Sequence, residues 1–88
     1  MPTFVFSNHA LRKFIFFKKH KIYIRRKDVG ETVLKGKVTD ASKLPVTEST
    51  GEFDAFHSLV VIYRKIRDGF FIITFWIAEK GRYERKIQ

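Results

Sequence analysis

Side chains that suit phosphate chemistry gather towards the C-terminal end of the chain. They are Arg64, Lys80, Arg82, Tyr83 and Arg85. Arginine binds phosphate through two parallel hydrogen bonds, lysine acts as a point charge, and tyrosine can stack on a base or pass a proton. We therefore expect these residues to line a phosphate-binding concavity beside a sheet. The alternative is that the charge-rich end of the chain is a solvated segment without fixed geometry.

The three histidines are the candidate general acids and bases, because an unperturbed imidazole titrates at about pH 6.5. His57 stands just before a predicted strand and is the candidate catalytic histidine, with a half-buried structural side chain as the alternative. His9 lies at a predicted helix start, where a hydrogen bond to the backbone is the simpler role. His20 is surrounded by lysines and belongs to a basic patch rather than to a catalytic site.

A second candidate surface is helical. Helical spacing predicts a basic face with one exposed ring, made of Arg12, Lys13, Phe16, Lys19 and His20. Basic side chains bind backbone phosphates, and a ring can stack on a base with a gain of about 1–3 kcal/mol. The alternative is that Phe16 packs against another subunit, as in a homodimer, or against an irregular part of the core.

The charge balance favours a polyanionic partner. Lysine and arginine number 18 against 9 aspartate and glutamate residues, a net charge of +9 on 88 residues. Such an excess repels itself in the folded state and is usually tolerated when a polyanion binds. Nucleic acid, with RNA preferred, is the first expectation, followed by an acidic protein or an anionic membrane. A charged surface of the thermophile type is the other alternative, but ion-pair networks need both signs in near balance.

Several classes of site and location are excluded or disfavoured. The chain has no cysteine, so disulfides, thiol catalysis and cysteine-ligated metals are excluded. Three histidines without cysteine make no metal-ligand pattern, and five scattered glycines make no nucleotide-binding loop, so we expect neither metal nor cofactor. No signal peptide is recognisable, and the longest apolar run, residues 70–78, is too short for a membrane helix. We therefore expect a cytoplasmic protein without a membrane partner.

These side chains must be positioned by a small number of elements. Residues 3–7 alternate polar and apolar side chains and predict a short strand. Ser7 and Asn8 are good N-caps for a helix that starts near His9 and runs to residue 21, and a second helix is predicted over residues 25–35. Residues 37–56 predict loops with one or two short strands.

The strongest structural signal is a hairpin. Residues 58–66 and 70–78 predict two strands, joined by a turn whose Asp68-Gly69 dipeptide favours positive φ. The second strand is apolar on both faces and is expected to lie centrally in its sheet. We expect four of its residues to be largely buried, with Ile73 and Phe75 on one face and Ile72 and Trp76 on the other.

The order of strand, two helices and further strands predicts a single α+β domain over residues 1–88. In this fold two N-terminal helices pack on one face of a twisted, mainly antiparallel sheet.

The sequence also resembles a known grouping. Ser7-Asn8-His9-Ala10-Leu11-Arg12 is similar to the Ser-x-His-Ala-x-x-Arg opening of a family of short bacterial, archaeal and phage domains of unknown function, which is grouped with the BrnT and RelE-like toxins. The similarity continues at Ile24, Asp28-Val29, Val33-Leu34, His57-Ser58-Leu59-Val60-Val61 and Ile72-Ile73-Thr74. It covers nearly the whole chain except residues 37–54, and a lysine and histidine cluster replaces a second arginine that the family has near the end of the first helix.

The resemblance implies a RelE-like fold and, in toxin members, metal-independent RNA cleavage that a cognate antitoxin blocks. Cleavage by attack of a 2′-hydroxyl on the adjacent phosphate needs a base, an acid and cations that stabilise the transition state. From their residue types we expect catalytic roles in such a reaction for His57, Arg64, Arg82 and Tyr83, with Lys80 and Arg85 binding RNA. The alternatives are a non-catalytic basic nucleic-acid-binding protein, such as a phage or archaeal-virus accessory protein, and a module that binds an acidic protein.

Overall fold

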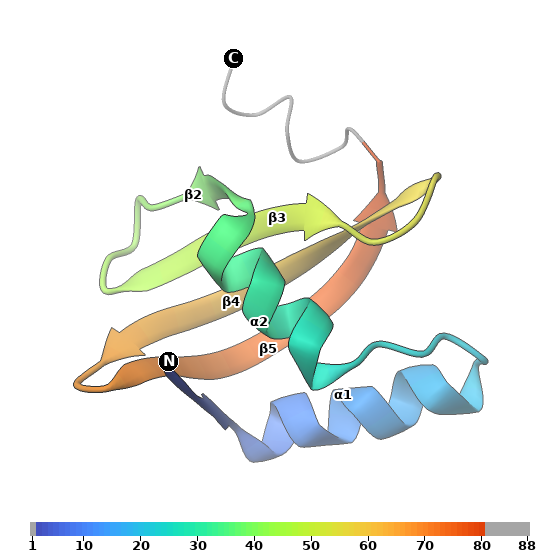
Figure 1. The fold of residues 1–88 in the computed structure, drawn as a ribbon, viewed down its shortest axis with the longest axis horizontal. Coiled ribbons are helices and arrows are strands. Elements are labelled where there is room, and N and C mark those ends of the chain that lie inside the picture. The colour runs from blue at the N-terminus through green and yellow to red at the C-terminus, as the bar shows by residue number, and fades with distance from the viewer. Residues whose placement is uncertain (1, 81–88) are drawn as a thin grey trace.

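Two helices and five strands make up residues 2–80, the part of the chain that the computed structural model describes (Figure 1). In chain order the elements are β1 (Thr3–Phe6), α1 (Asn8–Lys19), α2 (Arg26–Lys35), β2 (Lys37–Asp40), β3 (Val46–Glu52), β4 (His57–Ile66) and β5 (Gly69–Glu79). The predicted α+β class is confirmed.

Helix α1 begins where the sequence predicts. The Ser7 side chain accepts a hydrogen bond from the backbone N–H of Ala10 at 2.9 Å, which satisfies one of the free donors of the first turn. The helix ends at Lys19, two residues earlier than predicted, and Lys21 adopts a left-handed φ of 61°. A residue in that conformation cannot continue a right-handed helix, so the chain turns away towards α2.

All five strands belong to one mixed sheet, in the order β1-β5-β4-β3-β2. Strand β1 pairs with β5 in parallel, whereas the other three pairs are antiparallel. The prediction that the last strand lies inside the sheet is confirmed, because β5 has β1 on one side and β4 on the other. Residues 37–56 contain two strands, of which β3 has seven residues.

The predicted hairpin is present, but the reason for its glycine differs from the prediction. Arg67 and Asp68 form a two-residue turn, and Gly69 is already the first residue of β5. The backbone of Gly69 lies outside the left-handed region. A Cβ atom there would lie 1.8 Å from the carbonyl oxygen of Thr3. Glycine is therefore required because β1 approaches the turn closely, not because φ is positive.

A bulge in β5 changes the predicted faces of that strand. Tyr63 pairs with Ile72 and Ile62 pairs with Thr74, so Ile73 is the extra residue. Because one extra residue reverses the alternation, Ile72 and Phe75 both face the buried core. The prediction that Ile73 and Phe75 share a face is wrong.

The predicted burial of the same strand is confirmed only in part. Ile72 and Phe75 are fully buried, whereas Ile73 and Trp76 are half-buried.

The core joins α1 to the sheet through aromatic rings. The rings of Phe14 and Phe17 lie 4.7 and 6.1 Å from that of Phe75, measured between centroids. Helix α1 contacts β5 and β1, and α2 contacts β3 and β4 (Figure 1). In the described part of the chain, neither helix is long and apolar enough to cross a membrane, and the predicted cytoplasmic location stays a prediction.

Candidate nucleic-acid interface

One face of α1 gathers the basic and aromatic side chains that the sequence singles out. We call it the α1 stripe, and it consists of His9, Arg12, Lys13, Phe16, Lys19 and His20. Spacings of three, four and seven residues place these side chains on one side of a helix. The adjoining side of the helix carries Ala10 and Phe17, which are buried in the core. The predicted basic face of this helix is therefore present in the fold.

Phe16 lies on the surface of this stripe. Phe16 is 54% exposed to solvent. The ring lies 5.4 Å from that of Phe17, edge to face, and 4.7 Å from the imidazole of His20. A hollow of about 270 Å³ opens beside it, lined by Phe16 with His9, Arg12 and Lys13. The stripe thus combines an accessible ring with cations on a shaped surface.

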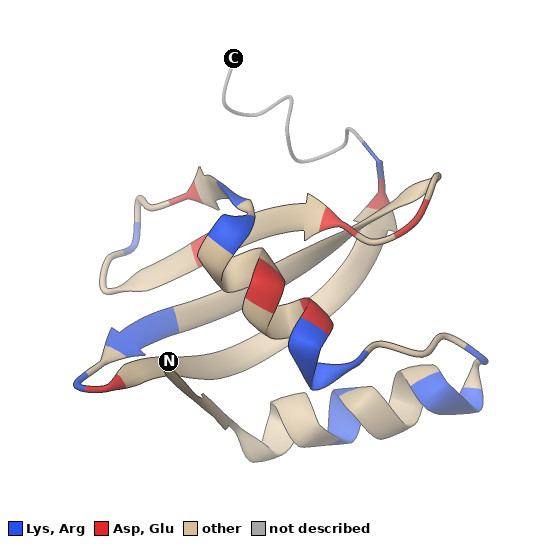
Figure 2. Cartoon of the chain, viewed as in Figure 1, with Lys and Arg blue, Asp and Glu red and all other residues tan. Residues whose placement is uncertain are grey.

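The first 27 residues of the chain contain no carboxylate side chain. The first acidic residue of the chain is Asp28, and eight of the 18 lysines and arginines precede it. Figure 2 shows basic positions along α1 and at the start of α2, whereas acidic positions begin on α2. Among the described residues no carboxylate forms an ion pair with a cation of α1. The sequence alone therefore shows that basic residues gather before Asp28 with no acidic residue among them, which the net charge does not reveal.

His57, the candidate catalytic histidine, is held by a neighbouring carboxylate. It is the first residue of β4, and its Nδ1 lies 3.0 Å from an oxygen of Asp54. The same oxygen accepts hydrogen bonds from the backbone N–H groups of Phe56 and His57, both at 2.8 Å. The Phe56 N–H, followed by the His57 side chain, lowers the pKa of Asp54. The arrangement orders the loop between β3 and β4, and within residues 2–80 it leaves Nε2 of His57 without a hydrogen-bond partner.

Lys80, predicted to bind nucleic acid, lies at the same end of the sheet. Its Nζ forms an ion pair with Glu52, and this hydrogen bond lowers the pKa of the Glu52 carboxyl. Its backbone N–H donates to the carbonyl oxygen of Phe56 at 2.9 Å. The structure therefore brings Lys80 and His57 to one loop, but Lys80 already has a carboxylate partner.

Arg64 lies at the other end of the hairpin. It pairs with Phe71, and its guanidinium carbon lies 5.3 Å from the centre of that ring. Seven residues of strand separate it from His57, which corresponds to about 23 Å. The structure therefore does not bring these two catalytic candidates together. Arg82, Tyr83 and Arg85 lie outside the described residues.

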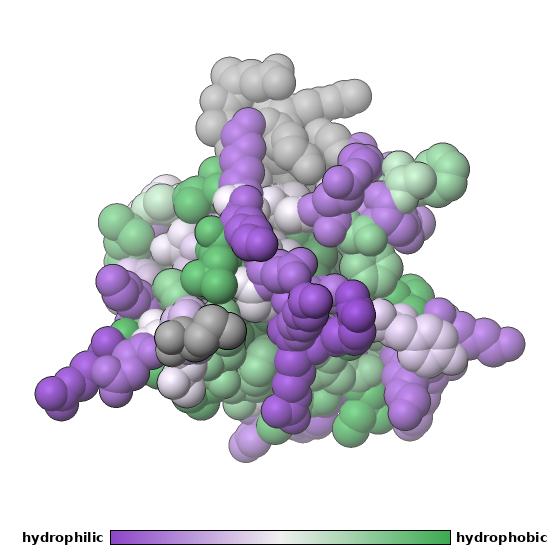
Figure 3. Space-filling view, viewed as in Figure 1, coloured by the Kyte–Doolittle hydropathy of each residue, from purple (hydrophilic) through white to green (hydrophobic). Residues whose placement is uncertain are grey.

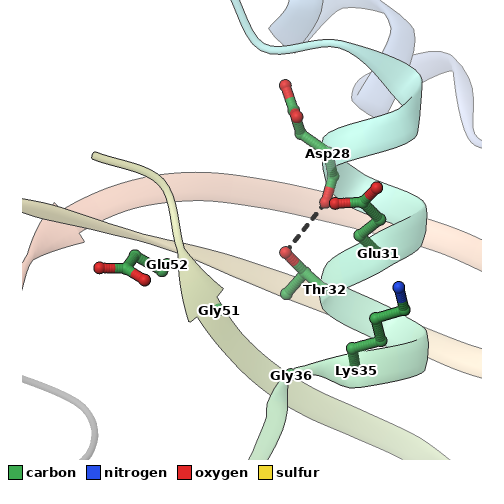
Figure 4. Close-up of a pocket in the computed structure, with 7 residues that line it drawn as sticks. All are labelled: Asp28, Glu31, Thr32, Lys35, Gly36, Gly51 and Glu52. Atoms are coloured by element: carbon green, nitrogen blue, oxygen red, sulfur yellow. Dashed lines mark hydrogen bonds between the residues drawn. The ribbon is translucent and has the colours of Figure 1, made fainter.

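The other hollows of the described residues differ from the one beside Phe16 in their linings. One of about 170 Å³ lies between α2 and β3, with the carboxylates of Asp28, Glu31 and Glu52 around it. Figure 4 shows these carboxylates pointing in different directions, and the described residues contain no cluster of three metal-ligating side chains.

A larger groove of about 600 Å³ runs beside α2 over the rings of Phe4 and Phe6. Figure 3 shows hydrophilic side chains standing over α2, with hydrophobic atoms visible between them. Nothing in the structure indicates what would cover this groove.

The resemblance to the RelE and BrnT grouping rests on the sequence around His9 and on the apolar hairpin, and it stays a prediction. Comparisons of the chain with protein-family models, with curated proteins and with solved structures return no match.

Proposed function

We propose that this protein binds the backbone of nucleic acids, with RNA preferred, through the α1 stripe. The proposal rests on one observation: a helix face with three lysine or arginine residues has no carboxylate partner among the described residues. Like charges on one helix face repel one another, and a bound polyanion removes that repulsion. Nucleic acid is the polyanion whose bases also suit an exposed ring such as Phe16.

Binding by this surface is expected to depend strongly on salt. Each phosphate that a lysine or arginine neutralises releases condensed counterions, so the logarithm of affinity falls linearly with the logarithm of salt concentration. The slope is about −0.7 to −0.9 for each neutralised phosphate. Arg12, Lys13 and Lys19 together therefore predict a contribution of about −2 to −3 to the slope.

The test compares two double variants with the same loss of charge. Arg12→Gln with Lys13→Gln removes two cations of the α1 stripe, whereas Lys37→Gln with Lys43→Gln removes two exposed cations from β2 and the loop that follows it. Fluorescence anisotropy with a labelled oligonucleotide across a salt series measures affinity and slope. We expect the α1 variant to lose most of its affinity at low salt, and the control to lose little.

Equal losses for the two double variants would mean that only net charge matters and that α1 is not the interface. No binding by the wild-type protein at low salt would overturn the proposal altogether.

A second candidate function is metal-independent cleavage of RNA, as in the RelE and BrnT toxins. The pair of His57 and Asp54 supports it, because a carboxylate at Nδ1 fixes the orientation of an imidazole whose Nε2 can then exchange a proton. The RelE-like arrangement, with both helices on one face of a twisted, mainly antiparallel sheet, belongs to this proposal. The contacts of α1 with β5, and of α2 with β3 and β4, support it.

Cleavage is tested with the wild-type protein and His57→Ala in the presence of a metal chelator. The second candidate requires loss of intact RNA with the wild-type protein, and a much slower single-turnover rate for His57→Ala at unchanged binding. RNA that remains intact with the wild-type protein would leave binding alone as the function, and co-purification of a small acidic protein would favour an antitoxin-like partner.

A further inference from the structure

An exposed phenylalanine in the middle of a cationic helix face is the feature that binding by charge alone leaves unexplained. Phe16 belongs to α1, whose buried side already has Phe14 and Phe17 to contact the sheet. Phe16 adds nothing to that contact with Phe75 and leaves apolar surface in water, which costs free energy. Phosphate binding needs no such ring.

The neighbours of Phe16 hold its ring on the outside. Phe17 meets it edge to face at 5.4 Å, and the imidazole of His20 lies 4.7 Å away at a tilt of 57°. The ring also lines the hollow of about 270 Å³ that His9, Arg12 and Lys13 complete. Phe17 and His20 therefore hold the aromatic ring of Phe16 in place beside this hollow.

Cations stand on both sides of this ring along the helix. Arg12 and Lys13 lie about one turn before Phe16, and Lys19 lies about one turn after it. Since a turn rises about 5.4 Å, the cations span about 10 Å along the axis with the ring between them. A strand whose phosphates meet these cations would carry a base over the ring.

We propose that the α1 stripe selects single-stranded nucleic acid by stacking an unpaired base on Phe16, an inference that rests on the proposed function and specifies its substrate. In a duplex each base is stacked on its neighbours and paired across the helix, so its flat face is closed to a side chain. In single strands, loops and ends the base can turn out and stack on an aromatic ring. Stacking of this kind tolerates every base, so the site discriminates by strandedness and not by sequence.

The experiment measures affinity for a labelled oligouridine RNA and for an RNA duplex of equal length, at one salt concentration. The variants are Phe16→Leu, which keeps an apolar side chain and the helix, and Phe16→Trp, which restores a ring. Phe56→Leu is the matched control, because Phe56 is 76% exposed but lies in the loop between β3 and β4. Circular dichroism and thermal melting establish that each variant is folded.

We expect Phe16→Leu to weaken single-strand binding by roughly 5- to 150-fold, with an unchanged salt slope because no charge is removed. Phe16→Trp and Phe56→Leu are expected to bind like the wild-type protein. A 2-aminopurine base in the single strand should lose fluorescence on binding to the wild-type protein and not on binding to Phe16→Leu, because stacking on the ring quenches it.

Three results would overturn the inference. Equal affinity for duplex and single strand, or full affinity of Phe16→Leu, would overturn it while steep salt dependence still supported binding by charge. Equal weakening by Phe56→Leu would show that the effect does not belong to α1. Absence of wild-type binding to either probe would overturn the inference together with the proposed function.

Discussion

Helix α1 and the loop between β3 and β4 both contain candidate functional residues, but their charges are arranged in opposite ways. In the α1 stripe, Arg12 and Lys13 have no carboxylate partner among the described residues. Near the loop, Lys80 pairs with Glu52, and His57 contacts Asp54. Exposed ion pairs contribute little to stability, yet each satisfies a charge that would otherwise be available to a ligand. This difference favours α1 as the surface whose charges remain available to an anionic ligand.

The largest effect is expected from Phe75→Ala. This residue is fully buried and contacts both Phe14 and Phe17, so its ring seats α1 on the sheet. Removing it should lower the free energy of unfolding by about 3–5 kcal/mol and release the basic face from its fixed position. Denaturant unfolding measures the loss, with the exposed Val5→Ala in β1 as the control. Near-normal stability of Phe75→Ala would show that α1 is seated by other contacts.

A smaller effect concerns Asp28, which marks the end of the carboxylate-free segment. Its carboxylate accepts the backbone N–H of Arg25 at 2.9 Å and pairs with that side chain at 3.0 Å. Partial burial raises the pKa of Asp28, but the hydrogen bonds and charge of Arg25 outweigh burial and leave the pKa lowered. Asp28→Ala should therefore cost about 1 kcal/mol at neutral pH, as the loss of a helix-start contact does.

The pH dependence follows from the direction of that pKa. A carboxyl whose pKa is lowered by folding contributes stability above its unfolded pKa of about 3.9, and the contribution is lost as pH falls through the folded value. Unfolding measured from neutral pH down to strongly acidic pH should show a shallower decline for Asp28→Ala than for the wild-type protein. Parallel curves for the two proteins would contradict the role of Asp28. The pKa values of Glu52 and Asp54 are also lowered, so some decline should persist in the variant.

The smallest effect is expected for Lys80→Gln. Because Glu52 already neutralises this lysine, its removal should change the salt slope of nucleic-acid binding very little. Lys19→Gln, which removes one unpaired cation of the α1 stripe, should reduce the slope by about 0.7–0.9. Comparing the two variants tests whether paired and unpaired cations contribute differently to binding. Equal changes in the salt slope for Lys80→Gln and Lys19→Gln would show that they do not.

Local patterns were enough to predict the parts of the fold that depend on neighbouring residues. The Ser7 cap, the two helices and the hairpin follow from capping chemistry, helical spacing and strand alternation, and they are present with shifts of one or two residues. The exposed position of Phe16 was predictable for the same reason, because helical spacing alone separates it from the core.

Features that depend on distant residues could not be predicted in the same way. The bulge at Ile73 coincides with a hydrogen bond that Ser7 Oγ donates to its carbonyl oxygen, across 66 residues of sequence. Strand β3 looks like a loop because its buried residues are polar. Ser49 is satisfied by the Tyr63 hydroxyl at 2.9 Å, and Thr50 by the Thr39 hydroxyl at 3.0 Å. The contact of His57 with Asp54 is local by contrast, since the two residues are three positions apart, and this spacing is a signal that the sequence offers.

The tie between Ser7 and Ile73 also has a consequence for the order of folding. Helix α1 is synthesised before the strand on which it packs, β5, which is the last element of the described fold. Contacts of such long sequence separation form slowly, because a large loop must close before they contribute. The nascent chain therefore carries α1 without the strand on which it packs until β5 has been made, and the basic face of α1 takes its final position late in folding.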